Sequence, residues 1–179
     1  MISNASPLIV LAKVELIQKI VKMYKTIVVS SKVAEEIIIE GLRMNRQDAV
    51  LLNALKKEGK IQVTSLDKKH EGLSERIIKE YNLDQGEAET ISLAMQLKNK
   101  EVLMDELLGR NVAKLFGLRA KGTLRVVLDL YKENQMNEKE VRTKVEEIIG
   151  KQFRLDAEIL AKFWEMFEMI KIRKEGEQR

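Results

Sequence analysis

Residues 1–14, MISNASPLIVLAKV, join a short apolar start to a polar turn and then to an apolar segment with helical spacing. Ile2 begins a short strand, and Ser6 is predicted to cap a helix with Pro7 at its first position, a favoured pairing. Asn4 therefore lies in the connection between the first predicted strand and the first predicted helix. In open α/β sheets, ligands bind at such connections, at the carboxyl ends of the strands.

The rest of the chain alternates short β-like runs with longer segments of helical spacing. The strand-like runs are 26–30, 61–66, 101–104 and 118–120. The helix-like segments are 31–41, 48–57, 74–81, 87–100, 106–116, 123–133, 138–149 and 156–172. Strands separated by helices imply right-handed crossovers and a parallel sheet. We therefore predict a three-layer α/β/α fold with a helical C-terminal segment.

Local signals predict where several of these elements begin and end. Ser31 is expected to cap the helix after the second strand, and Gly41 is expected to end it. Residues 67–73 are polar and irregular, which predicts a loop containing His70, with Ser74 capping the next helix. We expect two segments within one domain, a core over 1–136 and helices over 137–179 that pack as part of it.

Composition excludes several classes of protein. The chain is 45% hydrophobic and 34% charged, as in globular proteins, and it has no cysteine for disulfides or thiolate chemistry. No apolar run approaches the roughly 20 residues of a membrane helix, and residues 1–8 lack signal-peptide features, so we expect a cytoplasmic protein. The net charge of +4 permits a nucleic-acid partner without requiring one.

Four polar residues follow strands or open helices at the predicted carboxyl edge of the sheet: Asn4, Glu36, Glu87 and Asp105. Each has an ordinary alternative, since acidic residues favour first helical turns and Asn favours turns. Carboxylates gathered from separate βα units repel one another unless a cation lies among them. Oxygen ligands without His or Cys suit Mg²⁺ or Mn²⁺.

Three stretches together resemble the PIN-domain proteins. They are SNASPLIVLAKV at 3–14, VVSSKVAEEI at 28–37 and GEAETISLAMQLKNKEVLMDELLGRNVAKLFGLRAKGTL at 86–124. The sequence is most similar to VapC-type relatives whose members open with an S-[DN]-[AT]-SPLI run and carry GEAEAI. The segment GKQFRLDAEIL at 150–160 is similar to the end of that branch, so the resemblance covers most of the chain.

The resemblance implies a metal-dependent ribonuclease. It also implies a role as the toxin of a toxin–antitoxin pair, since many members of the family are such toxins. Carried over by motif, the four acidic positions of the family fall on Asn4, Glu36, Glu87 and Asp105, and Ser6 matches the hydroxyl residue that supports the first. Glu36, Glu87 and Asp105, with Asn4, would hold Mg²⁺ or Mn²⁺. The metal would activate water for hydrolysis of an RNA phosphodiester.

Basic residues follow the last acidic position closely. Arg110, Lys114, Arg119 and Lys121 are expected to line a phosphate track, the alternative being a solvated basic face. By analogy with the family we also expect a homodimer and a cognate antitoxin partner.

Asn4 departs from the family pattern, because an amide carbonyl ligates a cation but brings no charge and cannot act as a base. Two functions therefore stay open. The first is a metal-dependent ribonuclease, and the second is a catalytically weak or inactive PIN-like module that binds RNA or a protein. A nucleotide-binding α/β protein is less favoured, because no Gly-rich phosphate loop follows any strand.

Overall fold

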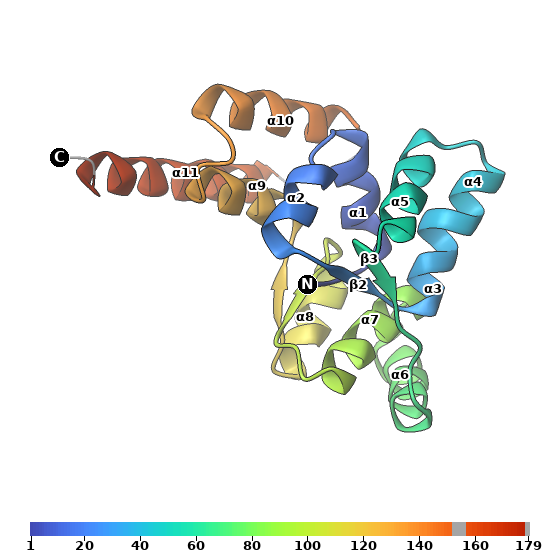
Figure 1. Ribbon diagram of the computed structural model, residues 1–179. Coiled ribbons are helices and arrows are strands. Elements are labelled where there is room, and N and C mark those ends of the chain that lie inside the picture. Colours follow the sequence, from blue (N-terminus) through green and yellow to red (C-terminus); the bar gives the residue numbers. More distant parts are fainter. Residues whose placement is uncertain (152–156, 178–179) are drawn as a thin grey trace. The chain divides into compact units, whose positions relative to one another are not determined.

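The computed structural model describes residues 1–151 and 157–177, so part of the segment 150–160 lies outside the described residues. Contacts divide the chain into two compact units, Met1–Thr123 and Leu124–Arg179. Figure 1 shows the sheet with its helices in the first unit and a run of helices toward the C-terminus. The expected boundary at residue 136, and the inclusion of 137–179 in the same domain, stay predictions.

The first unit is built on a five-stranded, all-parallel sheet with the order β3-β2-β1-β4-β5. The strands are β1 (Ile2–Ser3), β2 (Ile27–Val29), β3 (Ile61–Val63), β4 (Glu101–Leu103) and β5 (Arg119–Lys121). The shortest strand lies at the centre, where Ile2 pairs with Val28 on one side and Val102 on the other. Sequence order reverses on either side of β1, which makes its carboxyl end the switch point of the sheet.

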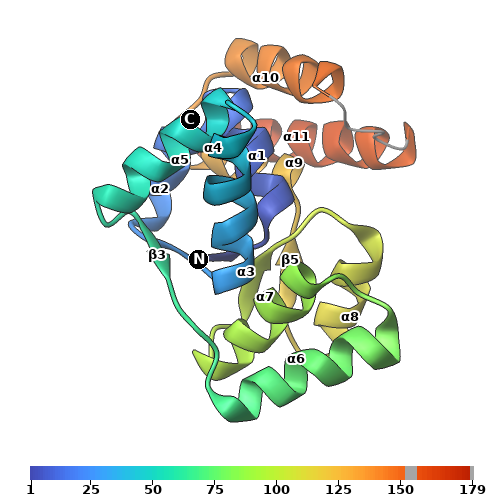
Figure 2. The same ribbon diagram turned by 90° about the vertical axis from the view of Figure 1, so that its right-hand side faces the viewer.

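Helices cover both faces of this sheet, which confirms the predicted three-layer α/β/α fold (Figure 2). One layer contains α1 (Ala5–Lys13), α2 (Ile17–Tyr24) and α5 (Gln47–Lys57). The other contains α7 (Gln85–Gln96) and α8 (Leu107–Leu115), with α6 (Lys68–Tyr81) packed against α7. Between β2 and α5 run α3 (Ser31–Ala34), a π-helical segment η1 (Glu35–Glu40) and α4 (Gly41–Arg43).

The core between the sheet and the α7 layer is aliphatic. Ile2 and Val102 of the central strands are fully buried, and they pack in one cluster with Ile91 of α7 and Val112 of α8. Burying aliphatic side chains on both faces of a parallel sheet supplies most of the free energy that holds such a fold together. The ends of these central strands are therefore held in place by the core.

The first helix begins two residues earlier than the sequence predicts. Asn4, not Ser6, is the N-cap of α1, and Pro7 is the third helical residue. Proline is accepted there because the first turn of a helix has no carbonyl partners for its N–H groups. The polar break at the start of the chain is therefore centred on Asn4.

The helix after β2 also differs from the prediction. Ser30, one residue before the expected Ser31, caps it by accepting a hydrogen bond from the Val33 N–H at 3.2 Å. Gly41 does not end the helical run, which passes through the π-helical segment η1 and continues into α4. Gly41 has another role, because a Cβ on it would stand 2.5 Å from the Cβ of Ala49 in α5.

The predicted loop over 67–73 is wrong, because α6 begins at Lys68. Asp67 is its N-cap and accepts a hydrogen bond from the His70 N–H at 2.9 Å. The first two turns expose polar side chains and contain Gly72, so their composition is that of a loop although their backbone is helical. Asp is a common N-cap residue, but the polar composition of this stretch favours a loop.

The second unit contains α9 (Thr123–Lys132) from Leu124 onward, α10 (Glu138–Gly150) and α11 (Ala157–Glu177). Its core combines aliphatic residues with aromatic rings: the ring centroids of Tyr131 and Phe167 lie 4.7 Å apart, and Phe163 is also buried. An ion pair at 2.8 Å between Lys171 and Glu138 joins α11 to α10. In the described part of the chain, no helix combines the length and apolar character that a bilayer crossing needs.

We predict opposite stability effects for alanine at two helical glycines. Gly41→Ala should lower the free energy of unfolding by about 1–3 kcal/mol, because its methyl group overlaps Ala49. Gly72→Ala, which has open space within 4 Å, should raise it by up to about 1 kcal/mol through helix propensity. Urea unfolding followed by circular dichroism measures both, and equal effects would contradict the close packing of α4 on α5.

Candidate metal centre

Asn4 lies at the carboxyl end of the central strand with its side chain turned inward. Its backbone N–H donates to the Leu103 carbonyl oxygen at 2.9 Å, which continues the β1–β4 pairing by one residue. Although Asn4 is the N-cap of α1, its side chain makes no capping hydrogen bond. The residue is 5% exposed, and Oδ1 is buried without a hydrogen-bond partner among the described residues. A buried oxygen in that state carries a desolvation cost that a ligand would relieve.

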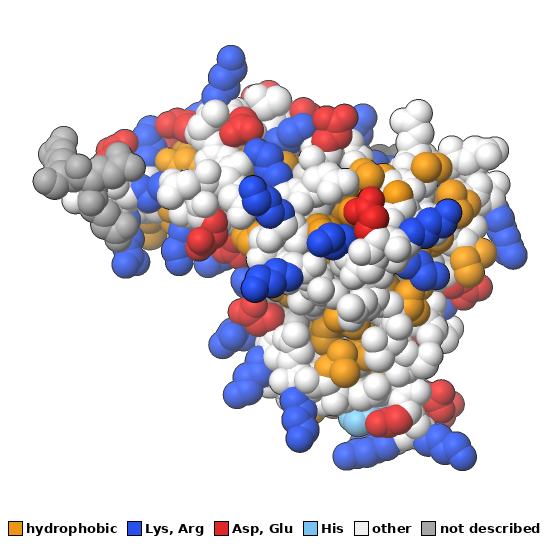
Figure 3. Space-filling view, viewed as in Figure 1, with side chains coloured by type: hydrophobic (Ala, Val, Ile, Leu, Met, Phe, Trp, Pro, Cys, Tyr) orange, Lys and Arg blue, Asp and Glu red, His pale blue; other side chains and the backbone are white. Residues whose placement is uncertain are grey.

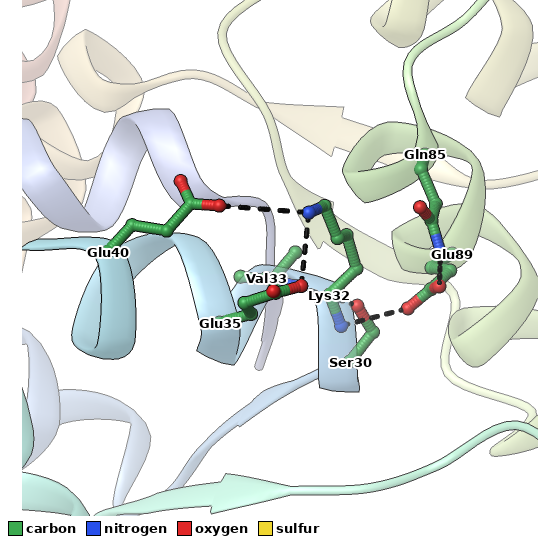
Figure 4. A network of polar contacts seen from close by, with 7 residues as sticks. All are labelled: Ser30, Lys32, Val33, Glu35, Glu40, Gln85 and Glu89. Atoms are coloured by element: carbon green, nitrogen blue, oxygen red, sulfur yellow. Dashed lines mark hydrogen bonds and ion pairs between the residues drawn. The ribbon is translucent and has the colours of Figure 1, made fainter.

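Glu36 is the inward-facing member of the Glu35–Glu36 pair. It is half-buried, whereas Glu35 is exposed and forms an ion pair with Lys32 at 3.0 Å (Figure 4). Both residues lie in η1, where hydrogen bonds run from i to i+5 and the α-helical direction of successive side chains is lost. Glu36 lies three residues after the buried Val33, on the side of the helical run that faces inward, whereas Glu35 lies on the solvent side.

A polar network joins the helix carrying Glu36 to α7. Glu89 of α7 accepts a hydrogen bond from the Lys32 backbone N–H at 3.1 Å and another from the Gln85 side chain at 2.8 Å (Figure 4). Free N–H groups at a helix start need such partners. Glu89 therefore acts as a structural link between α3 and the first turn of α7.

The first turn of α7 is closed by a capping box between Asp84 and Glu87. Asp84 Oδ1 accepts a hydrogen bond from the Glu87 N–H at 2.7 Å, and Glu87 Oε2 accepts one from the Asp84 N–H at 3.4 Å. This arrangement holds both carboxylates at the helix start, where negative charge is favoured.

Three side-chain oxygens surround the point where a Cβ on Gly86 would stand. They are Asn4 Oδ1 at 3.2 Å, Glu36 Oε1 at 3.3 Å and Asp84 Oδ1 at 3.4 Å. The oxygens come from three separate segments of the chain, and the missing side chain of Gly86 leaves room between them. We call this group the Gly86 oxygen cluster.

Glu87 points from the same turn toward α8. Its Oε1 lies 2.5 Å from the position that a Cβ on Gly109 would take, and Met104 Sδ lies equally close. Glu87 is 5% exposed, and Oε1 has no hydrogen-bond partner within the described part of the chain. Glycine at position 109 is therefore what admits the Glu87 carboxylate.

Asp105 follows β4 and is held by Thr123. The Thr123 N–H donates to Oδ1 at 2.7 Å, and its hydroxyl donates to Oδ2 at 2.6 Å. Arg110 lies on the same side, since a Cβ on Gly122 would be 3.1 Å from Asp105 Oδ1 and 3.6 Å from Arg110 Nη1. Asp105 is thus oriented by hydrogen bonds and accompanied by a positive charge.

The pKa values of all three predicted carboxylates are raised, chiefly by burial. For Glu36 the charge of Asp84 adds to burial, and the pKa of Glu87 rises to about 7 through burial, then Asp84, with a smaller effect of Glu106. Burial also raises the pKa of Asp105, against the opposing effect of the two hydrogen bonds from Thr123. Asp84 therefore acts on Glu36 and Glu87 together.

The structure brings Asn4 and Glu36 together and adds Asp84, while Glu87 and Asp105 lie beside other partners. Among residues 1–151 and 157–177, no three His, Asp or Glu side chains are grouped closely enough to hold a metal ion by themselves. Ser6 is half-buried in the first turn of α1. Asp84 is not among the predicted site residues, although Asp84 and Glu87 show the spacing of a capping box in the sequence.

The four basic residues predicted to bind RNA differ in exposure and in their ion-pair partners. Arg110 is half-buried beside Asp105, and Lys114 is exposed on α8. Arg119 and Lys121 both pair with Glu101, at 3.2 and 3.5 Å. On the face shown in Figure 3, Lys and Arg side chains are scattered among acidic and apolar ones instead of forming a continuous patch.

The sequence matches the PIN-domain family over residues 1–168. The chain belongs to the PIN-domain family. A comparison with curated proteins gives no match. PIN domains have a nuclease fold and generally use divalent metal ions.

The Gly86 oxygen cluster of this PIN domain fits a hard divalent cation. It offers one amide and two carboxylate oxygens, with an orphaned buried acceptor, Asn4 Oδ1, directed into it. Mg²⁺ and Mn²⁺ accept such oxygens and complete their shells with water. Asn4 and Glu36 are the two members that the family motifs also predict.

The raised pKa of Glu87 predicts how the metal-free PIN domain responds to pH. Between pH 4.5 and about 7 the folded protein binds a proton that the unfolded chain releases, so this group lowers stability as pH rises. Glu87→Gln keeps the capping box and removes this cost. At pH 8 the variant should unfold at a higher temperature than the wild type, with a free energy of unfolding larger by no more than about 3 kcal/mol. At pH 4 the two proteins should be equally stable.

Thermal unfolding in a chelating buffer, followed by circular dichroism at both pH values, measures this difference. Glu75→Gln, at an exposed position of α6, controls for the loss of one carboxylate. A gain in stability that is the same at pH 4 and pH 8 would contradict burial of an ionised Glu87.

Proposed function

We propose that this PIN domain is a Mg²⁺- or Mn²⁺-dependent ribonuclease that hydrolyses RNA phosphodiester bonds. The observation that carries the proposal is the Oδ1 of Asn4, which is buried without a partner among the described residues and lies, like Glu36 Oε1, beside Gly86 at the switch point of the sheet. Family membership supports the same reaction class.

The proposed roles follow from where each carboxylate lies. Asn4 and Glu36 would bind the cation, and Glu87 and Asp105 would complete the acidic site directly or through water. A bound divalent ion would lower the pKa of a water molecule and stabilise charge on the scissile phosphate. Glu87, with a pKa of about 7, holds a proton in part of the molecules at neutral pH, and a cation nearby would favour its release.

Arg110 is the basic residue best placed to meet RNA at the site. Its Nε is buried and has no hydrogen-bond partner among the described residues, and its guanidinium lies beside Asp105. A guanidinium pairs with phosphate through two parallel hydrogen bonds. Lys114 is exposed one helical turn further along α8, while Arg119 and Lys121 already share Glu101 and would contribute less.

A second candidate function is a PIN module that binds RNA or a protein partner with little or no catalysis. Two observations favour it. Asn4 brings no charge, and the described residues contain no group of three acidic or His side chains close enough to hold a metal ion alone. Activity as the toxin of a toxin–antitoxin pair, a cognate antitoxin and a homodimer remain proposals from the family resemblance.

RNA cleavage by the Asp105→Asn variant tests the proposed reaction. Asn has the shape of Asp and retains an acceptor for the Thr123 N–H, so the fold should survive while the charge is lost. We expect Mn²⁺-dependent cleavage of a labelled single-stranded RNA to fall at least about 100-fold. Asp67→Asn, at the exposed N-cap of α6, is the matched control and should cleave like the wild type.

The outcomes separate the two candidate functions. Cleavage that persists in a chelator, or that is unchanged in Asp105→Asn, would contradict the ribonuclease proposal. RNA that is bound but not cleaved at saturating Mn²⁺ would favour the binding module.

A further inference from the structure

Asp84 carries a carboxylate that the family motifs do not assign and that lies at the point where the site lacks charge. Its Oδ1 lies 3.4 Å from the position of a Cβ on Gly86, compared with 3.3 Å for Glu36 Oε1 and 3.2 Å for Asn4 Oδ1. Asn4 is the one neutral residue in the expected acidic set. The structure therefore places an extra carboxylate next to the position where one is missing.

The orientation of Asn4 is the independent sign of a ligand at this point. An Asn at an N-cap normally accepts a hydrogen bond from its own helix, which contributes about 1 kcal/mol. The Asn4 side chain makes no such bond, is 95% buried, and has no other partner for Oδ1 in the described part of the chain. Oδ1 instead faces the carboxylates of Glu36 and Asp84, which are acceptors and cannot donate to it when ionised.

Three acceptors facing one another are held together only if something positive or hydrogen-donating lies between them. Asp84 is exposed to solvent, whereas Asn4 is buried. The Gly86 oxygen cluster is therefore accessible to solvent on the side of Asp84 and buried on the side of Asn4. The nearest basic side chain on the helical run that carries Glu36 is Lys32, and it is paired with Glu35 and Glu40 (Figure 4). A small cation entering from the Asp84 side fits this arrangement.

We propose that Asp84 is a ligand of the divalent cation and supplies the negative charge that Asn4 lacks. This inference rests on the proposed metal-dependent function. It assigns the cation to the Gly86 oxygen cluster, bound by Asn4, Glu36 and Asp84 directly or through water. The capping of α7 by Asp84 is compatible with this role, because each carboxylate oxygen accepts more than one contact.

The test is Mn²⁺ binding to the full chain, measured by isothermal titration calorimetry and by the electron paramagnetic resonance signal of free Mn²⁺. Asp84→Asn removes the charge and keeps an excellent N-cap, so α7 should still form. We expect it to weaken Mn²⁺ binding by about 10- to 100-fold. Asp67→Asn is the matched control, since Asp67 caps α6 in the same way and lies at an exposed position, and it should change affinity less than about twofold.

A charge exchange provides the second variant. Asn4→Asp in the Asp84→Asn background returns the carboxylate to the family position, and we expect it to restore affinity to within about threefold of the wild type. Circular dichroism and thermal unfolding without metal show that each variant is folded.

The outcomes distinguish this inference from the proposed function. Wild-type binding that Asp84→Asn does not weaken, or weakens no more than Asp67→Asn, overturns the role of Asp84 and leaves the ribonuclease proposal standing. A wild type that binds no Mn²⁺ overturns both. Binding that depends on Asp84, without any RNA cleavage, supports the cation site and overturns the ribonuclease proposal.

Discussion

The parallel pairing of β1 with strands on both sides is the constraint on which the rest of the first unit depends. Two residues, Ile2 and Ser3, pair with β4, and Ile2 also pairs with β2. The hydrogen bond from the Asn4 N–H to Leu103 extends that pairing to the strand end. Because parallel strands point the same way, it places Asn4 at the same sheet edge as Asp105, although about a hundred residues separate them in sequence.

The polar groups at this edge of the sheet lie in an electrostatically unfavourable environment. Burial and neighbouring acids raise the pKa of Glu36 and Glu87, and oxygens of Asn4 and Glu87 are buried without partners among the described residues. Each unpaired buried group costs about 1–3 kcal/mol. The aliphatic core and the capping box of α7 offset that cost by fixing the backbone. A loss of stability at such polar, buried positions is typical of sites that a protein keeps for function.

The errors in the prediction have specific local causes. Polar composition over 67–73 hid a helix whose cap at Asp67 is clear once the structure is known. The proline at position 7 favours Ser6 as the N-cap, but Asn4 holds that position. The glycine at position 41 predicts a helix end, whereas its close approach to Ala49 explains why glycine is needed there. In each case a tertiary contact or a competing capping residue outweighed the local signal.

The sequence by itself determined the fold class and the membership of Asn4, Glu36, Glu87 and Asp105 in βα units of a parallel sheet, because hydrophobic periodicity and motif spacing are local properties of the chain. The tertiary structure alone decided where their side chains point. Glu36 reaches the space beside Gly86, Gly86 leaves room there for oxygens from three segments, and the missing side chain of Gly109 leaves room for Glu87. It also brought in Asp84, because only the packing of distant segments places oxygens of Asn4, Glu36 and Asp84 around the same space beside Gly86.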